Sequence, residues 1–498
     1  MKGKVYLVGA GPADGGLLTL KGYRLLQQAD VVVHDALIGL EVLGMIPPEA
    51  RRIPVGKRAG NHPVPQERIN EILLEEAQKG RMVVRLKGGD PFLFGRGGEE
   101  LELLARHGVP FEVVPGVTSA LAVPAYGGIP VTHRDYCSSV HLITAHAQGC
   151  AHAPDIDYRA LVRLGGTLVF LMGVSTLPAI CRGLLEAGMD PEMPAAILER
   201  GTTARQRRAV STLAQLPQVA QGFSAPSVVI VGKVCALSER FAWAEKRPLA
   251  GLRVAVTRPR ERMSALSGPL RELGAEVLEL PAILLQPISP NLQLDRALEH
   301  LEAYDWLVFT SPGGVSCFWD ALKERRMDVR RLAGLRLAAI GRATAQALEA
   351  RGLLVDLVPE EYSADALGRA LALQGPRRAL LLRAKNASPD LTARLKEAQI
   401  PYEDLPLYET AASPEAARAR ELVERGEVDY VAFTSASTVH SFMKGSGQGD
   451  GRGIRAACIG RTTAAAARAY GMETFVAEQA TMEAMCALLQ KLQEKERS

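Results

Sequence analysis

The sequence predicts an α/β protein with several domains, and three observations lead to this expectation. Short apolar runs such as Met82–Leu86 lead through glycine-rich turns into segments with helical spacing, here Glu99–Arg106. A chain of 498 residues exceeds one ordinary hydrophobic core and implies roughly two to four domains. The tripeptide Phe-Thr-Ser ends an expected strand at residues 309–311 and again at 433–435, which indicates an internal repeat.

Composition excludes several classes of protein. Hydrophobic residues at 47% and charged residues at 23% are typical of a globular chain. No apolar run reaches membrane-spanning length and the first residues resemble no signal peptide, so we expect no membrane partner and a cytoplasmic location. The seven cysteines form no Cys-x-x-Cys pair, which argues against a zinc site and a disulfide framework. With a net charge of +4 and no long basic run, we expect no nucleic acid partner.

The front half is organised around residues 85–100, Arg-Leu-Lys-Gly-Gly-Asp-Pro-Phe-Leu-Phe-Gly-Arg-Gly-Gly-Glu-Glu. Paired glycines where a strand ends indicate that something approaches the backbone closely, because a Cβ atom would block it. Asp90 places a carboxylate at the carboxyl end of the strand, where open α/β sheets bind ligands. The alternative for a single Gly-Gly-Asp is a tight turn without a ligand.

The first expected strand, Lys4–Gly9, runs into a Gly-x-Gly-Pro turn that ends at Pro12. A dinucleotide-binding fingerprint would have a third glycine where this chain has Asp14. Pro12 also lacks the backbone N–H that a phosphate-binding turn uses. We therefore reject NAD, although the turn can still bring the backbone against a flat ligand.

Three further segments carry polar residues that have two interpretations each. Asp35 ends the second expected strand and is either a helix cap or a functional carboxylate. Lys57 and Arg58 lie in a glycine-rich loop that is either a solvated turn or a contact for acidic groups. Thr118 and Ser119 follow a later strand and either cap the next helix or face a ligand.

A second α/β unit begins near Gly165. Its apolar strand, Thr167–Gly173, contains Met172, and a methionine in a buried strand is more often core filler than a ligand contact. Gly201 lies in a Glu-Arg-Gly-Thr turn, and the last strand of the unit is expected at Ser227–Ala236.

Taken in order, residues 1 to about 237 resemble the tetrapyrrole methyltransferases, and specifically the uroporphyrinogen-III C-methyltransferase family. The resemblance implies S-adenosylmethionine as cofactor, a tetrapyrrole substrate and a homodimer. It also implies cofactor contacts at nine residues, namely Pro12, Gly88, Gly89, Asp90, Leu93, Thr118, Ser119, Met172 and Gly201.

The same resemblance assigns catalytic roles. It makes Asp35 the proton acceptor, Lys57 the proton donor and Arg58 a substrate contact. The chain departs from the family pattern at Ala145, where glycine is usual, and at Leu171, where tyrosine is common.

Composition changes at residues 238–251, which look like a short tether. Beyond the tether, the pattern Ile-Gly-x-x-Thr-Ala at 340–345 recurs at 459–464. Two similar lobes are implied, with hydroxyl groups and helix N-termini directed at one cleft, an arrangement that suits anions. The alternative is ordinary helix capping without a ligand.

From residue 251 to about 489 the chain resembles the uroporphyrinogen-III synthase family. That family implies two flavodoxin-like lobes joined by a two-stranded ladder, which we expect near Pro281–Leu285 and Leu405–Thr410. One lobe would combine 251–283 with 409–498, and the other would span 284–408. Three residues match positions of the cleft: Tyr408 as the candidate catalytic residue, and Thr344 and Thr462 as candidate substrate contacts.

Together, the resemblances predict a methyltransferase at 1–242 and a synthase at 251–498, with neither site drawing residues from the other half. The synthase would close hydroxymethylbilane to uroporphyrinogen III with inversion of the last ring. The methyltransferase would then methylate this product twice to precorrin-2, a precursor of sirohaem and cobalamin. No metal is implied. The alternative is a methyltransferase acting on another tetrapyrrole, with a non-catalytic anion-binding module as the back half.

Overall fold

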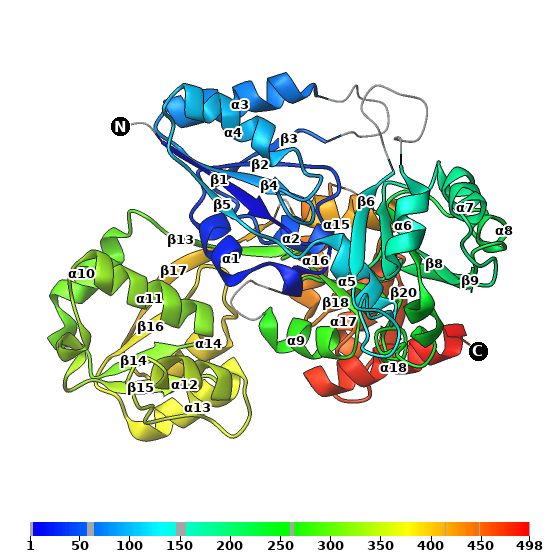
Figure 1. The fold of residues 1–498 in the computed structure, drawn as a ribbon. Helices are drawn as coiled ribbons and strands as arrows, with labels where there is room; N and C mark the ends of the chain where they lie inside the picture. Colours follow the sequence, from blue (N-terminus) through cyan, green and yellow to red (C-terminus); the bar gives the residue numbers. More distant parts are fainter. Residues whose placement is uncertain are drawn as a thin grey trace.

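The computed structural model describes residues 3–56, 64–145, 156–258, 263–413, 415–447 and 449–497. The chain forms four five-stranded sheets with helices packed against them, which confirms the predicted α/β class. We call residues 3–237, which hold the first two sheets, the front half, and residues 252–497, which hold the other two, the back half (Figure 1).

The first sheet is parallel throughout, with the strand order β3-β2-β4-β1-β5. Its elements are β1 (Lys4–Gly9), α1 (Leu20–Gln27), β2 (Val31–His34), α2 (Leu40–Gly44), β3 (Arg51–Pro54), α3 (Gln66–Gln78), β4 (Met82–Lys87), α4 (Gly97–Arg106), β5 (Phe111–Val114) and α5 (Ser119–Tyr126). In β2, Val31 and Val33 share a buried cluster with Leu73 of α3, while Val32 shares another with Leu26 of α1. Because both of its faces are covered, β2 carries three successive buried valines, Val31–Val33.

The second sheet is mixed, with the order β6-β7-β10-β8-β9 and only the β6–β7 pair parallel. Its elements are β6 (Val140–Thr144), α6 (Tyr158–Leu164), β7 (Thr167–Leu171), α7 (Leu177–Glu186), β8 (Pro194–Glu199), β9 (Arg207–Thr212), α8 (Leu216–Val219) and β10 (Ser227–Val231). The strand expected to reach Ala236 ends at Val231, because a 3-10 helix, Lys233–Leu237, begins after Gly232. Helix α5 joins the two units, since its Val123 shares a buried cluster with strands of this sheet.

The third sheet is parallel and combines two distant parts of the chain, with the order β12-β11-β18-β19-β20. Its elements are β11 (Arg253–Val256), α9 (Ser264–Glu272), β12 (Glu276–Glu279), α15 (Glu415–Glu424), β18 (Tyr430–Phe433), α16 (Ala436–Gly445), β19 (Arg455–Cys458), α17 (Arg461–Ala469), β20 (Glu473–Val476) and α18 (Met482–Arg497). The expectation that the first strand of the back half and the C-terminal segment share one lobe is therefore confirmed.

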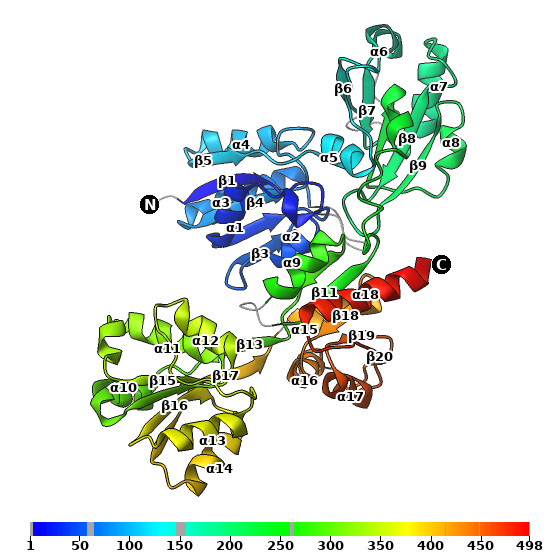
Figure 2. The ribbon, with the colours of Figure 1, turned by 90° about the horizontal axis from the view of Figure 1, so that it is seen from below.

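The fourth sheet has the order β13-β17-β16-β14-β15. Its elements are β13 (Ile283–Pro287), α10 (Leu292–Glu299), β14 (Trp306–Phe309), α11 (Pro312–Glu324), β15 (Arg336–Ala339), α12 (Arg342–Glu349), α13 (Ala364–Gln374), β16 (Ala379–Ala384), α14 (Asp390–Glu397) and β17 (Tyr402–Ala412). Strands β13 and β17 pair antiparallel, which confirms the two-stranded ladder, and they lead from this lobe to the third sheet (Figure 2). The exact domain boundaries stay a prediction.

The segment 238–251 is not the free tether that its composition suggested. Ser238 and Leu249 are fully buried. The indole of Trp243 donates to the carbonyl oxygen of Ala125 at 2.9 Å and stands edge-on to the ring of Tyr126 at 5.0 Å. The apolar and aromatic residues of the segment 238–251 therefore pack it against the rest of the chain, although its composition indicated a free tether.

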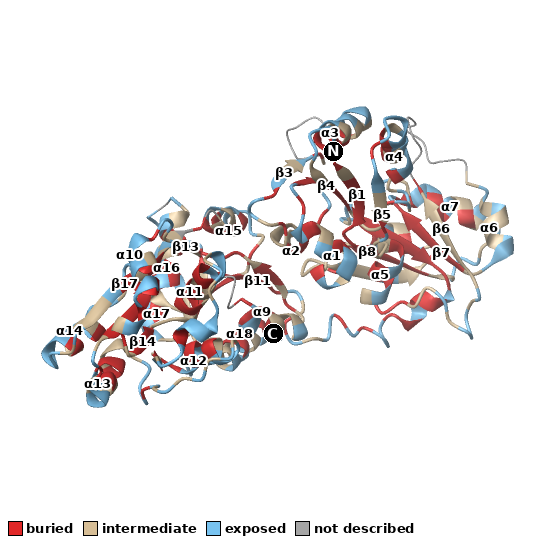
Figure 3. Ribbon diagram, turned by 90° about the vertical axis from the view of Figure 1, so that its left-hand side faces the viewer, coloured by how far each residue is buried: buried red, intermediate tan, exposed pale blue. Residues whose placement is uncertain are grey.

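Buried residues follow the strands, while exposed ones lie along the outer helix faces (Figure 3). Within the described ranges, no helix combines the length and apolar character needed to cross a membrane. The same ranges hold no group of three or more His, Cys, Asp or Glu side chains that could bind a metal ion.

Contacts between glycines bring the ends of β1, β4 and β5 together. A Cβ atom on Gly9 would lie 2.5 Å from the Cα atom of Gly116, and one on Gly116 would lie 2.2 Å from the carbonyl oxygen of Gly89. Gly89 and Gly11 exchange two backbone hydrogen bonds, of 2.8 and 3.2 Å. The loops at this edge can approach so closely only because these side chains are absent.

We expect Gly116→Ala to destabilise the first sheet by about 1–3 kcal/mol, because the added methyl group overlaps neighbouring backbone. Urea-dependent hydrogen exchange of the β1 and β4 amides measures this change. Gly98→Ala is the matched control, since a Cβ atom there meets nothing within 4 Å. Equal stability of the two variants would contradict the close approach of the loops.

Candidate functional site

The residues predicted to bind the cofactor from the first sheet lie at one edge. Pro12 follows β1, Gly88–Asp90 follow β4, and Thr118 and Ser119 follow β5. Since the carboxyl ends of parallel strands meet at the same edge, the fold brings these loops together, and Asp35 joins them at the end of β2.

A cavity of about 340 Å³ lies between these loops and those of the second sheet. Pro12, Ser119 and Gly201 line it, so three of the nine predicted cofactor residues share one space. Its volume falls within the range of small-molecule pockets, roughly 300–1,000 Å³. We call it the shared cavity, because five back-half residues also line it: Arg253, Glu276, Leu422, Arg425 and Glu427.

The shared cavity is lined by both halves, whereas we expected neither site to draw residues from the other half, and its use as the cofactor site stays a prediction. The back half supplies part of its wall because α2 packs against β12 across the junction. Sequence motifs identify each half separately and carry no information about which surfaces of the two halves meet.

Gly89 and Asp90 shape the loop after β4. Gly89 has a φ of +66°, and a Cβ atom built on it would touch only the backbone of Thr118 and Ser119, at 3.8–3.9 Å. The Asp90 carboxylate accepts backbone hydrogen bonds from Phe92 at 2.8 Å, Leu93 at 3.1 Å and Gly116 at 3.0 Å. Asp90 therefore holds two loops together, and its contact with a cofactor stays a prediction.

The other predicted cofactor residues have distinct surroundings. Thr118 caps α5, with its hydroxyl oxygen accepting from the amide of Ala120, and its contact with a cofactor stays a prediction. Met172 follows β7 with half of its surface exposed and a φ of +58°, which places it outside the core. Leu93 is partly buried against the second sheet. A Cβ atom on Gly201 would overlap Val123 at 2.4 Å, so helix packing alone already requires glycine there.

Asp35 belongs to a buried charge cluster. Arg85 donates to Asp35 at 2.6 Å and to Glu100 at 3.1 Å, and Lys87 donates to Glu100 at 2.8 Å. Arg85 and Glu100 are almost fully buried, whereas the Asp35 side chain keeps 31% of its surface exposed. The cluster thus fixes a partly accessible carboxylate at the strand edge. The predicted donor and substrate contact, Lys57 and Arg58, lie outside the described residues.

The sequence reasoning missed the charged residues that support Asp35. Burial lowers the pKa of the Lys87 ammonium, while the carboxylates of Asp35 and Glu100 raise the pKa of Arg85 in spite of its burial. The signal was the run Met-Val-Val-Arg-Leu-Lys, which places two cations in an otherwise apolar central strand. Buried cations need partners, so they point to a charge cluster.

The two departures from the family pattern are both accommodated by packing. Ala145 is buried and its amide donates to the carbonyl of Leu171 at 2.9 Å. Leu171 belongs to the apolar cluster beneath α5, so it contributes to the core.

In the back half, helices begin after the strands of both lobes, as the repeat predicted. Ser311 caps α11 by accepting from the amide of Gly314 at 3.0 Å, and Ser435 caps α16 by accepting from Thr438 at 3.2 Å. The hydroxyl of Tyr408, on β17, lies 2.7 Å from the Ser311 hydroxyl oxygen. This hydrogen bond ties the candidate catalytic residue to the first turn of α11, and its catalytic role stays a prediction.

The two threonines predicted as substrate contacts differ in exposure. Thr344 is buried inside α12, whereas Thr462 is exposed at the start of α17. The residue equivalent to Thr344 in the repeat is Thr463, which is buried in the same way. Substrate binding by either predicted residue stays a prediction, and for Thr344 the burial favours a packing role.

Two family models match the chain, one for each half. Residues 4–217 match the tetrapyrrole (corrin/porphyrin) methylases, and residues 264–487 match uroporphyrinogen-III synthase HemD. These matches confirm both resemblances stated from the sequence.

Relatives cover the whole chain or one half of it. The porphyrin biosynthesis protein HemD of Ruminiclostridium josui is 46% identical over 488 residues, 97% of each chain. Siroheme synthase 2 of Cronobacter sakazakii is 53% identical over 242 residues, 49% of this chain and 52% of that protein.

Among solved structures, the uroporphyrin-III C-methyltransferase of Thermus thermophilus, complexed with S-adenosyl homocysteine, is 42% identical. It covers 47% of this chain and all of that chain, with a TM-score of 0.42. The full-length relative and the two family models lead to one conclusion: the chain belongs to the porphyrin biosynthesis HemD family, with a tetrapyrrole methylase in its front half and a uroporphyrinogen-III synthase in its back half.

Proposed function

We propose that the chain makes precorrin-2 from hydroxymethylbilane in two reactions. The back half closes hydroxymethylbilane to uroporphyrinogen III, and the front half methylates that product twice. The observation that supports this proposal most strongly is that one chain matches both family models, at 4–217 and 264–487. The same chain matches a porphyrin biosynthesis protein over 97% of its length. The product of the first reaction is the substrate of the second, so the fusion joins consecutive steps.

The shared cavity fits the methyl donor that this proposal requires, S-adenosylmethionine. Pro12, Ser119 and Gly201 line a space of suitable volume, and Gly89 leaves the neighbouring backbone open because it carries no side chain. When bound, S-adenosylmethionine supplies an electrophilic methyl group on a sulfonium. The loops of the chain contribute by orienting the reactants and excluding water.

Asp35 is the proposed proton acceptor of the methylation. Its carboxylate is held by Arg85 at 2.6 Å and keeps part of its surface accessible, as a group that takes a proton from a bound substrate must. Lys57 is the proposed proton donor and Arg58 a proposed contact for the substrate carboxylates.

In the synthase half, Tyr408 is the proposed source of general-acid help. Closure needs loss of water from the hydroxymethyl group, and a positioned hydroxyl can donate a hydrogen bond to the departing oxygen. The Ser311 hydroxyl, 2.7 Å away, restrains the phenol in one position. A cytoplasmic homodimer that supplies precorrin-2 for sirohaem or cobalamin completes the proposal.

Incubation with hydroxymethylbilane and S-adenosylmethionine tests the proposed function. We expect uroporphyrinogen III without the methyl donor and a product heavier by two methyl groups with it, resolved by isomer separation and mass. Type I isomer at the uncatalysed rate would instead show that the back half is an anion-binding module. Methylation of a different tetrapyrrole would overturn the assigned substrate.

We expect Gly89→Val to abolish binding of S-adenosylhomocysteine in calorimetry, because the branched side chain would enter the space left for the cofactor. The control is Gly165→Val, which also places a valine at a positive φ, +69° compared with +66°, but meets nothing within 4 Å. The control should bind normally. Normal binding by both variants would place the cofactor elsewhere.

Asp35→Asn should slow methyl transfer by about 10²-fold or more, the usual size of a lost general base. The amide keeps the shape of the side chain and can still accept from Arg85, so cofactor affinity should persist. Asp30→Asn, the same change at the opposite end of β2, should leave turnover unaltered. Wild-type turnover of Asp35→Asn at saturating substrate would show that this carboxylate serves only as part of the charge cluster.

A further inference from the structure

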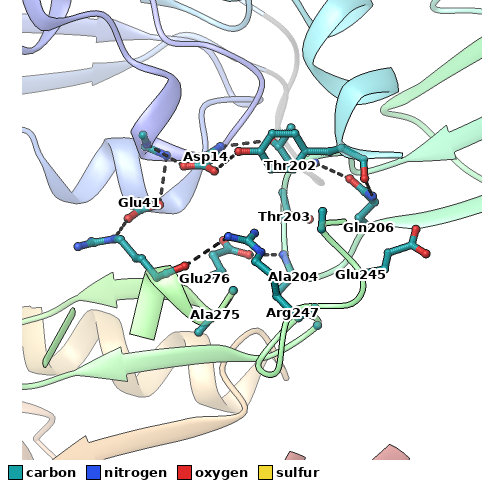
Figure 4. A pocket seen from close by; sticks show the side chains of 18 of the residues that line it. Asp14, Glu41, Thr202, Thr203, Ala204, Gln206, Glu245, Arg247, Ala275 and Glu276 are labelled. Carbon is teal, nitrogen blue, oxygen red and sulfur yellow. Dashed lines mark hydrogen bonds and ion pairs between the residues drawn. The ribbon is translucent and has the colours of Figure 1, made fainter. Parts of the chain in front are cut away.

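The halves meet at a second cavity, of about 670 Å³, which adjoins the predicted cofactor loops (Figure 4). Front-half residues Asp14, Glu41 and Thr202 line it together with back-half residues Arg271 and Glu276. Arg271 pairs with Glu41 and Glu276 accepts from Ala204 across the junction, so the residues around this cavity form a joint between the halves.

The first loop at this joint is the segment 200–206, which carries Gly201. Arg200 and Thr202, on either side of the glycine, have φ angles of +48° and +67°. Residues with a Cβ atom adopt this conformation only when their surroundings hold them there. The front half supplies some of these restraints, including a 2.8 Å hydrogen bond from the amide of Thr202 to Gln206.

The back half supplies the remaining restraints on this loop. Arg205 forms a bidentate ion pair with Asp429, at 2.8 and 3.1 Å. The guanidinium also donates to the carbonyl oxygen of Gly426 at 3.2 Å and to that of Gly251, the last residue of the segment 238–251, at 3.3 Å. The amide of Ala204 donates to Glu276 at 2.8 Å. The planar guanidinium donates to four acceptor atoms, so it fixes the position of the loop in addition to neutralising the charge of Asp429.

The loop that contains Pro12 is restrained from the same side. Glu41 is almost fully buried and accepts from the amide of Gly15 at 3.1 Å. Its other oxygen pairs with Arg271, a back-half residue that also binds Glu279 at 3.0 Å. The amide of Asp14 donates to the Thr202 hydroxyl at 3.3 Å, which joins the two loops.

We propose that the synthase half positions the cofactor loops of the methyltransferase, mainly through Arg205, which also lines the shared cavity. This inference rests on the proposed function, since it takes the shared cavity as the cofactor site. The affinity for the methyl donor then depends on contacts made by a domain that catalyses a different reaction. Because coupling is reciprocal, cofactor binding also tightens the junction.

Calorimetry with S-adenosylhomocysteine on the full-length chain tests the role of Arg205. Arg205→Ala should raise the Kd at least about fivefold, the lower end of usual coupling between sites. Arg205→Lys keeps the positive charge but cannot form the bidentate ion pair with Asp429, so it should give an intermediate Kd. Conversion of hydroxymethylbilane should stay at the wild-type rate in both variants, which shows that the synthase half is folded. A smaller rise in Kd for Arg205→Ala overturns the proposal.

Arg325→Ala is the matched control. Arg325 also pairs with an aspartate, Asp295, and its side chain is 28% exposed, compared with 27% for Arg205. That pair lies entirely within the fourth-sheet lobe, so its loss should leave the cofactor affinity unchanged. A wild-type chain that does not bind S-adenosylhomocysteine would contradict the proposed function itself, a result distinct from failure of the positioning role.

Hydrogen exchange of the wild-type chain gives a second test that needs no variant. Saturation with S-adenosylhomocysteine should slow exchange at residues 201–206 and also at the synthase residues 426–430, which carry Asp429. Protection confined to the front half would overturn the proposal even if Arg205→Ala failed to fold.

Discussion

The candidate cofactor site depends on one steric constraint, the close approach of three backbone loops at the edge of the first sheet. Gly9 and Gly116 leave no room for side chains between the loops that follow β1, β4 and β5. Asp90 then connects the β4 and β5 loops through its hydrogen bond to the amide of Gly116. A parallel sheet places the loops at a common edge. The contacts between the loops then determine how much of their backbone remains accessible to a ligand.

The junction between the halves adds a constraint of a different kind. Ion pairs at Arg205 and Arg271, together with the packed segment 238–251, connect the two halves directly. Because the segment is packed, the two sites keep a defined relation, unlike sites on a flexible linker. Fusion therefore does more than raise the local concentration of an intermediate, since one enzyme contributes to the architecture of the other.

Most of the fold could be predicted because each strand end carries its own local signal. The Gly-Gly-Asp turn, the Gly-x-Gly-Pro turn and the repeated Phe-Thr-Ser step each lie where the structure has a strand end. The ladder of β13 and β17 was also located correctly, through family resemblance. Asp35 was identified as a candidate carboxylate, although its ion pair with Arg85 links residues 50 positions apart and leaves no local pattern.

Features that depend on contacts between distant parts of the chain could not be predicted. Arg205 and Asp429 are 224 positions apart, and neither lies in a recognisable motif. The segment 238–251 has the Pro, Gly and charged residues of a tether, but Trp243 and Leu249 anchor it to distant parts of the chain. Within the repeat, Thr344 is equivalent to Thr463, since both precede the alanine of the shared pattern.

A crystal structure of the full-length chain with S-adenosylhomocysteine tests the central claim most directly. The claim is that one cavity, built by both halves, holds the cofactor. The ligand should lie against Pro12, Ser119 and Gly201, with the 200–206 loop still bonded to Asp429 through Arg205. Ligand bound outside this cavity, or a loop detached from the synthase half in the complex, would contradict it.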